Sequence, residues 1–372
     1  MPSTLTWDME THFETAGEGH PVVLIHGLTL DLRIWNPQWK VLSRGAHVVR
    51  YDLRGHGESS APAGLYSAEN LAMQLRTLLD ALRISRPILV GHAFGAALAL
   101  HFALLHRTRV AALVLANPEI WGAPVPEESA YQPGKSPIDD AGVVEDPRTC
   151  KRALQAWLQS PLFEATRRNQ QAFRAIESIA LAHGCAPWTR PEPFEQPDDW
   201  SSLSSIDIPT LVLFGSNEDA YFRAAARSLG ERIPGTRVIE LPETGHAANV
   251  EKPVEFNRHA LEFLQALGFV GALRPGAEIP PKARRKKRPR GGRKKPEREP
   301  FRPPPPEEKP PASKPQRERR RRRRRPRRDE AAPAGGERPP REKRPAPAEP
   351  PKEEKRGFWS RLFGKKNKAP ED

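Results

Sequence analysis

The 372-residue sequence has only two cysteines, Cys150 and Cys185, too few for a disulfide framework. Neither lies in a C-x-x-C spacing of the kind found at metal sites, so we expect two isolated, reduced thiols. No run reaches the roughly 18 consecutive apolar residues that span a bilayer, since even residues 89–105 are interrupted by two histidines. Residues 1–19 contain few apolar side chains, which argues against a signal peptide. These absences predict a soluble protein of a reducing, cytoplasmic compartment.

Charge and proline divide the chain into two parts. Residues 271–372 carry 36 basic and 15 acidic side chains, whereas residues 1–270 carry 24 and 31. The same last part holds 22 of the 42 prolines. A segment so charged and so poor in apolar residues cannot bury a core. We therefore predict a globular domain over residues 1–270 and a disordered tail over residues 271–372.

The composition of the tail also predicts its partners. Its net charge of +21, with seven consecutive arginines at 319–325, attracts polyanions such as RNA, DNA or an anionic membrane. Such binding through residues 276–372 would be independent of sequence, steeply sensitive to salt, and able to hold the protein at that surface. A merely solubilising tail is the alternative. Residues 357–364 form an aromatic and basic island, which at helical spacing predicts a short docking motif for a membrane or a partner groove.

Short apolar runs alternate with helix-period stretches in the first 270 residues, a pattern typical of a parallel sheet covered by helices. The expected strands are Val22–Ile25, Val48–Tyr51, Ile88–Val90, Val110–Leu115, Leu211–Phe214 and Val238–Leu241, each read as buried on both faces. The expected helices are Ser67–Leu82, capped by Ser67, then Ala96–Leu105, and Val254–Leu267, with Pro253 in its first turn. The alternation of expected strands and helices is interrupted at about residues 118–205. This long, aromatic-rich insertion between two strands predicts a lid. Its aromatic side chains either line a substrate pocket or pack the lid onto the body.

The strand expected at residues 88–90 runs into Gly91-His92-Ala93-Phe94-Gly95 and then into a helix of small residues. A strand, a G-x-X-x-G turn and a helix form a nucleophile elbow, in which two glycines permit a strained turn that presents residue X at the start of the helix. Ala93 occupies position X, where serine is expected. Because a methyl group cannot attack a carbonyl, the pattern predicts an elbow without its nucleophile.

Two backbone amides are candidates for an oxyanion hole. The first expected strand ends in His26-Gly27-Leu28, a turn whose glycine lets the Leu28 N–H face outward. Phe94 follows the central residue of the elbow and supplies the second N–H.

Acidic and imidazole side chains follow the last two expected strands. Residues 211–214 lead into Gly215-Ser216-Asn217-Glu218-Asp219, and a carboxylate at this edge can orient a histidine. Counting from Gly215 favours Glu218, whereas reading back from Ala220 favours Asp219; we prefer Asp219 and keep Glu218 as the alternative. The alternative without a catalytic role is that both acidic residues lie in a solvent-exposed first turn of a helix.

His246, on a glycine-containing loop after the last strand, is placed to act as a general base.

His26-Gly27, the loop Asp52 to Ser59, the elbow and Gly245-His246 together closely resemble the α/β-hydrolase superfamily over about residues 10–268. The resemblance implies a mostly parallel central sheet with helices on both faces and an inserted helical lid. It also implies that the loop Asp52 to Ser59 is a structural turn and that His92 packs beside the elbow. It leaves the reaction open, because esterases, lactonases, dehalogenases, C–C hydrolases and lyases share this scaffold.

Ala93 departs from the family pattern at the residue that forms the covalent intermediate, and three hypotheses follow. In the first, His246, oriented by an acid, activates water; carbamate and aminoacrylate hydrolases are similar in carrying Gly-His-Ala-x-Gly, although the lid looks more like that of carboxylesterase-type members. In the second, the fold is a noncatalytic module that binds a small ligand or a partner. In the third, alanine replaces a natural serine. We predict hydrolysis of a small ester, lactone, amide or carbamate, with no metal or organic cofactor.

Overall fold

The computed structural model describes residues 2–62, 66–133, 147–188, 194 and 196–270, all within the first of two compact units, Met1–Lys286. The tail predicted over residues 271–372, including the motif at 357–364, lies outside the described residues. Part of the segment predicted as a lid, residues 134–146, 189–193 and 195, lies outside them too.

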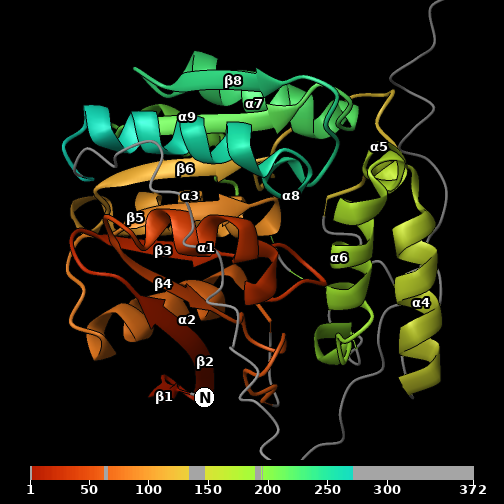
Figure 1. The fold of residues 1–372 in the computed structure, drawn as a ribbon, viewed down its shortest axis with the longest axis horizontal. Coiled ribbons are helices and arrows are strands. Elements are labelled where there is room, and N and C mark those ends of the chain that lie inside the picture. Colours follow the sequence, from red (N-terminus) through yellow and green to blue (C-terminus); the bar gives the residue numbers. More distant parts are fainter. Residues whose placement is uncertain (1, 63–65, 134–146, 189–193, 195, 271–372) are drawn as a thin grey trace, which may run out of the picture. The chain divides into compact units, whose positions relative to one another are not determined.

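One eight-stranded sheet, in the order β1-β2-β4-β3-β5-β6-β7-β8, forms the centre of the described part (Figure 1). Strands β3 to β8 are parallel, whereas β1 and β2 pair antiparallel at one edge. Their bounds are β1 Ser3–Thr6, β2 Met9–Ala16, β3 Pro21–Ile25, β4 His47–Tyr51, β5 Ile88–His92, β6 Ala112–Ala116, β7 Thr210–Gly215 and β8 Arg237–Leu241. All six strands expected from the sequence form, and the fold is the one that the resemblance implied.

The two edges of the sheet differ from the sequence prediction. The antiparallel pair β1 and β2 was not predicted, because most of its residues are polar and neither strand contains a continuous apolar run. β8 is the opposite edge strand and is buried fully only at Leu241, so it is not the doubly covered strand that we expected.

Helices cover both faces of the sheet. The helices α1 (Asn36–Leu42), α8 (Ala248–Glu251) and α9 (Pro253–Ala266) pack on one face, and α2 (Ala68–Ala81), α3 (Phe94–Leu105) and α7 (Ala220–Arg232) on the other (Figure 1). Successive strand residues alternate between the two cores: Val22 and Leu24 face α1 and α9, whereas Val23 and Ile25 face α2 and α3. This alternation buries apolar surface on both sides of every central strand.

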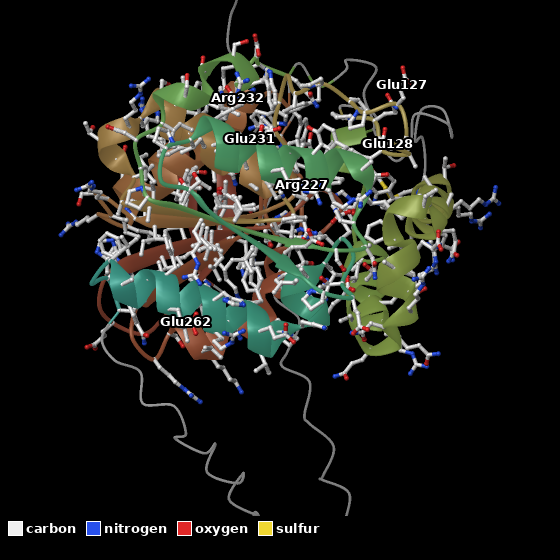
Figure 2. The ribbon with its side chains drawn as sticks, turned by 90° about the horizontal axis from the view of Figure 1, so that it is seen from above. Glu127, Glu128, Arg227, Glu231, Arg232 and Glu262 are labelled. Carbon is white, nitrogen blue, oxygen red and sulfur yellow. A yellow bond between two sulfur atoms is a disulfide. The ribbon has the colours of Figure 1, made fainter. Side chains whose placement is uncertain are left out.

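Helix ends follow the capping signals in the sequence. The Ser67 hydroxyl accepts a hydrogen bond from the Asn70 N–H at 3.3 Å, and Pro253 is the first residue of α9. The outer side of α7 carries charged side chains, among them Arg227, which lies 3.5 Å from the Glu240 carboxylate (Figure 2). Among the described residues, no helix combines the length and the apolar character needed to cross a membrane.

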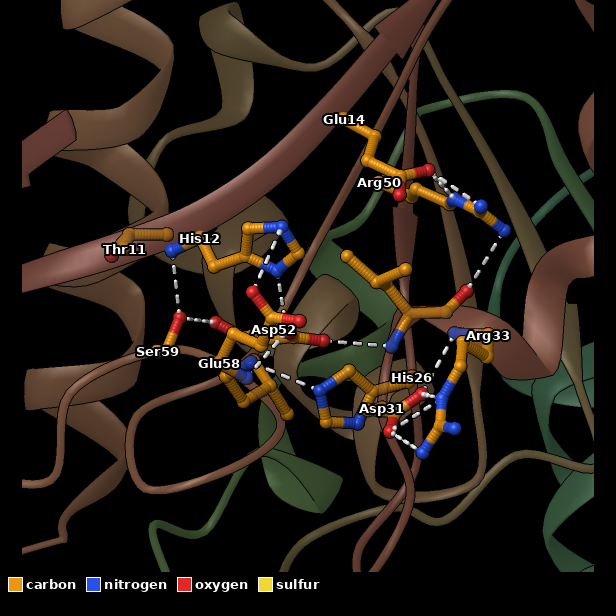
Figure 3. Close-up of polar contacts among 12 residues, drawn as sticks. Thr11, His12, Glu14, His26, Asp31, Arg33, Arg50, Asp52, Glu58 and Ser59 are labelled. Carbon is orange, nitrogen blue, oxygen red and sulfur yellow. Dashed lines mark hydrogen bonds and ion pairs between the residues drawn. The ribbon is translucent and has the colours of Figure 1, made fainter. Parts of the chain in front are cut away.

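The loop from Asp52 to Ser59 is a structural turn, as the resemblance implied. The buried Asp52 carboxylate accepts hydrogen bonds from the Leu32 and Glu58 N–H groups and from His12 Nδ1, at 2.8 to 2.9 Å (Figure 3). These bonds tie the loop to β2 and to the segment that follows β3, since a buried carboxylate needs several donors. The loop contributes no side chain to the cavity described below.

The segment between β6 and β7 contains the helices α4 (Pro147–Gln159), α5 (Glu164–Arg168) and α6 (Gln170–Ala180), which lie together beside the ends of the strands (Figure 1). Its aromatic side chains fulfil both roles considered for them. Trp157 and Phe163 line a cavity, whereas Phe194 packs against Trp121 and Phe94 with ring centroids 5.4 and 5.3 Å apart.

Cys150 and Cys185 form a disulfide, so the prediction of two reduced thiols is wrong for this structure. The sequence does not reveal the pair, because the two cysteines are 35 positions apart and only the packing of α4 against residues 181–185 brings them together. A bond that closes a loop of this length stabilises a fold by roughly 3 to 4 kcal/mol, mainly by restricting the unfolded chain. The cysteines therefore no longer argue for a reducing compartment.

Candidate active site

The turn between β5 and α3 has the strained geometry of a nucleophile elbow. Ala93 has φ of 48° and ψ of −112°, a conformation that non-glycine residues rarely adopt. A Cβ atom on Gly91 would lie 2.3 Å from the Gly95 carbonyl oxygen, and one on Gly95 would lie 2.4 Å from the Ile25 carbonyl oxygen. Gly91 is thus needed for the close approach of β5 to the first turn of α3, and Gly95 for the close approach of α3 to the end of β3. Strain of this kind costs on the order of 1–3 kcal/mol, and the chain keeps it although the residue displayed is alanine.

A small cavity of about 20 Å³ lies at the elbow. Its volume suffices for one water molecule, which needs about 10–15 Å³ by the same measure. The cavity lies beyond the carboxyl ends of β3, β5 and β6 and beneath the lid helices, and it is mostly apolar. The residues that line it are Gly27, Leu28, Leu30, His92, Ala93, Phe94, Glu119, Tyr131, Trp157, Leu162, Phe163, Phe222 and His246.

His246 reaches this cavity from the loop after β8. Its ring is held by edge-to-face contacts with Phe222 and Phe163, at centroid distances of 4.6 and 5.6 Å. Its Nδ1 lies 3.1 Å from Glu218 Oε2. With Nδ1 bound to a carboxylate, Nε2 is left as the proton-accepting nitrogen, which is the arrangement of a general base.

The acid beside His246 is Glu218, so our preference for Asp219 is corrected. The Glu218 side chain is fully buried, and Oε2 also accepts a hydrogen bond from the side-chain amide of Asn117. Asp219 is instead the N-cap of α7, and its carboxylate accepts hydrogen bonds from Tyr221 N–H, Ser129 Oγ and Ala130 N–H. The physical reason is one of position: the residue that caps α7 is committed to the helix, and the longer side chain before it is free to reach the histidine.

His92 packs beside the elbow, as expected. Its Nε2 donates a hydrogen bond to the His246 carbonyl oxygen at 2.8 Å, and burial lowers the pKa of His92 to about 3. The neutral ring therefore fixes the backbone of the His246 loop rather than exchanging protons.

The two predicted oxyanion donors both line the cavity. Leu28 follows β3, and Phe94 is the first residue of α3, where the N–H groups of a helix have no intrahelical acceptor. Within the described part of the chain, neither of these two N–H groups donates a hydrogen bond to another residue. Two free amides at a helix start can stabilise a developing negative charge on an oxygen atom.

Comparison with known proteins identifies the family. The family model for the alpha/beta hydrolase fold matches residues 20–253. The chain belongs to this family. It is 32% identical over 253 residues, 66% of this chain and 93% of the relative, to a protein of Pseudomonas savastanoi pv. phaseolicola to which the name carbamate hydrolase RutD has been assigned. It is also 27% identical over 266 residues, 66% of this chain and 90% of the relative, to a Bacillus subtilis protein assigned as 2-succinyl-6-hydroxy-2,4-cyclohexadiene-1-carboxylate synthase.

Among solved structures, the enol-lactonase from Burkholderia xenovorans LB400 is similar. It is 26% identical in sequence, with a TM-score of 0.58, and the match covers 71% of this chain and all of the lactonase chain. The match extends over almost the whole described domain of this α/β-hydrolase-fold protein.

Sequence reasoning missed three polar residues of this α/β-hydrolase site. Asn117, at the end of β6, donates from its side-chain amide to Glu218 and to the Gly245 carbonyl oxygen at 3.0 Å, so it joins the acid to the histidine loop. Glu251 holds that loop from the other side. Glu119 lines the cavity itself. No motif marks any of them, although each lies within a few residues of a strand end or of His246.

Glu119 is 2% exposed, and its Oε2 accepts a hydrogen bond from the Tyr131 hydroxyl at 2.9 Å. Burial raises the pKa of Glu119 to about 7, although the Tyr131 hydrogen bond and the nearby His246 act in the opposite direction.

Within the described ranges, no group of three or more His, Cys, Asp or Glu side chains is arranged to hold a metal ion.

Replacing Glu251 with alanine should lower the free energy of unfolding by about 3 kcal/mol, because buried donors would lose a charged acceptor. The Glu251 carboxylate accepts hydrogen bonds from the Gly245 and Ala247 N–H groups at 2.9 and 3.1 Å, and from the Thr166 hydroxyl of α5 at 2.7 Å. Urea unfolding measures the change. Glu255→Ala on α9, where the partly exposed carboxylate has only a 3.9 Å ion pair with Lys252, is the control and should change stability by less than about 0.5 kcal/mol; equal effects of the two variants would contradict the assignment.

Proposed function

We propose that this protein hydrolyses a small carbonyl compound, an ester, lactone, amide or carbamate, by direct attack of water. His246 is the general base, Glu218 orients it and stabilises its charged form, and the Leu28 and Phe94 N–H groups hold the oxyanion. The observation that carries the proposal is the shared cavity: His246 and the Ala93 methyl group border a space the size of one water molecule.

Water at this point would stand where the hydroxyl of an elbow serine acts in related enzymes. His246 would take a proton from the water while the oxygen attacks the carbonyl carbon. The tetrahedral oxyanion would form against the two amides, which are preorganised by the start of α3 and by the turn after β3. The small, apolar cavity excludes bulk water and so strengthens both electrostatic interactions.

The relatives support the substrate class. One carries the name of a carbamate hydrolase, and the similar solved structure is an enol-lactonase. Both enzyme names refer to substrates that contain a polarised carbonyl group. Such substrates suit a site that has a base and oxyanion donors but no serine.

Ala93 itself favours a second candidate, a noncatalytic module that binds a small ligand or a partner. In that case the elbow and the His246–Glu218 pair are architecture, and the basic tail would hold the module on a polyanion. A ligand would then bind without turnover, and removing residues 276–372 would abolish binding to RNA or to anionic vesicles without altering the pocket.

The deciding experiment is an activity assay of the protein as its sequence stands. A panel of aryl esters, simple lactones, carbamates and amides should include substrates that are turned over, with product release followed by liquid chromatography. If neither the protein nor its Ala93→Ser variant hydrolyses any member of the panel, the hydrolase proposal fails and the binding module is favoured.

A further inference from the structure

We propose that Glu119 is a catalytic acid of this site, which protonates the leaving group of the substrate while His246 takes a proton from water. The proposal rests on the hydrolase function proposed above. It extends that function toward substrates whose leaving group is too basic to depart as an anion, such as alkyl esters, carbamates and amides.

The position of Glu119 supports this role. Its backbone N–H donates to the Ala93 carbonyl oxygen at 3.3 Å, so the residue is attached directly to the elbow. Its carboxyl group borders the same cavity as His246, and among the described residues that line this cavity it is the one carboxyl group. A carboxyl group that only stabilised the fold would not need to face a cavity of apolar side chains, where its burial is unfavourable.

The hydrogen bonds of Glu119 engage its two oxygens unequally. Oε2 accepts the Tyr131 hydroxyl at 2.9 Å, whereas Oε1 accepts the Gln196 amide at 3.5 Å, a long contact, and the Trp121 side chain also acts on the carboxyl group as a hydrogen-bond donor. The titratable groups that face Glu119 are Tyr131, His246, and Tyr221 of α7, whose hydroxyl donates to the Ile120 carbonyl oxygen. Both tyrosines stay neutral, since burial raises their pKa values well above the ordinary range.

A direct attack by water needs a second proton donor for a simple reason. In serine hydrolases one histidine passes the proton of the nucleophile to the leaving group, and the acyl-enzyme divides the reaction into two steps. Without the acyl-enzyme, the attack of water and the departure of the leaving group share one tetrahedral intermediate. The imidazolium then lies beside the newly bound hydroxyl, and a donor at another point of the cavity can serve the leaving atom.

The proton and bond changes balance. An O–H bond of water breaks and its proton goes to His246, while the oxygen bonds to the carbonyl carbon. The bond from that carbon to the leaving atom then breaks, and the leaving atom takes the proton of the Glu119 carboxyl group. The products are an acid and a neutral alcohol or amine, and the proton on His246 returns to the Glu119 carboxylate through solvent.

Leaving-group dependence tests the proposal. Glu119→Gln should lower kcat about 100-fold for ethyl acetate, whose ethoxide leaves poorly, but less than about 3-fold for 4-nitrophenyl acetate, whose phenolate needs no proton. With ethyl acetate, kcat/KM of the unaltered protein should fall as the pH rises through about 7, where Glu119 of the free protein loses its proton, and the variant should lack this decline. Tyr131→Phe removes a donor that stabilises the carboxylate, so it should move the decline to higher pH and keep the preference between the two esters.

Controls separate this proposal from the hydrolase function itself. Glu14→Gln makes the same chemical change at a carboxylate paired with Arg50, away from the cavity, and should leave the ratio of the two rates unchanged. Circular dichroism and thermal unfolding verify that each variant is folded. Equal losses for both esters in Glu119→Gln, or turnover of the nitrophenyl ester alone by the unaltered protein, would overturn the role of Glu119 and leave the hydrolase function intact. No turnover of either ester would overturn both.

Discussion

Replacing His246 with alanine should reduce kcat/KM by about 10² to 10⁴-fold on any substrate that the protein hydrolyses, because it removes the imidazole that takes the proton from water. The imidazole is the one side chain there that combines an acceptor nitrogen with a buried carboxylate partner, Glu218 at 3.1 Å. Steady-state kinetics of the purified variant measures the loss, and exogenous imidazole should restore part of the activity.

A matched control is available in His259 of α9, whose side chain is likewise mostly buried but does not line the cavity. His259→Ala should keep kcat/KM within about 2-fold, since it touches neither the cavity nor the loop of His246. If His246→Ala were as active as His259→Ala, the base would have to be sought elsewhere and the proposed water activation would be wrong.

Replacing Ala93 with serine should convert the site into that of a covalent hydrolase. The elbow already has the strained backbone of a displayed nucleophile, and His246, Glu218 and the two free amides already surround it. A serine hydroxyl placed there would be activated in the ordinary way. We expect stoichiometric labelling of the variant by a fluorophosphonate and a burst of nitrophenol from 4-nitrophenyl acetate, neither of which the unaltered protein gives.

The double variant Ala93→Ser with His246→Ala is the control for this experiment and should label at least about 100-fold more slowly. Labelling that does not depend on His246 would indicate that the introduced hydroxyl is not aimed at the imidazole, in contradiction to the geometry described here. Labelling at position 93 in the single variant alone would confirm that the catalytic arrangement is complete except for its nucleophile.

The sequence predicted the fold well because the fold depends on patterns that are local. The central strands are short apolar runs, and the elbow requires glycines at Gly91 and Gly95 that can be recognised without knowledge of the rest of the chain. The edge strands β1 and β2 escaped prediction because their mixed polarity resembles that of a loop.

The site was predicted only in part, because several of its contacts join residues that are distant in sequence. His246, Leu28 and Phe94 could be identified from their places after strands. The choice between Glu218 and Asp219 depended on which side chain caps α7, and the link to Asn117 spans 101 residues. Glu119 and the Cys150–Cys185 disulfide likewise depend on how the segment between β6 and β7 folds back, which no local pattern records.

The central claim, that water primed by His246 is the attacking group, is tested most directly by rapid-quench intact-protein mass spectrometry during a single turnover of 4-nitrophenyl acetate, with enzyme in excess over substrate. The account predicts that no acyl adduct is found at any time and that nitrophenol and acetate form at the same rate. An acetylated protein that forms together with nitrophenol and disappears as acetate is released would contradict it, because that result would mean that a side chain, and not solvent, attacks the carbonyl carbon.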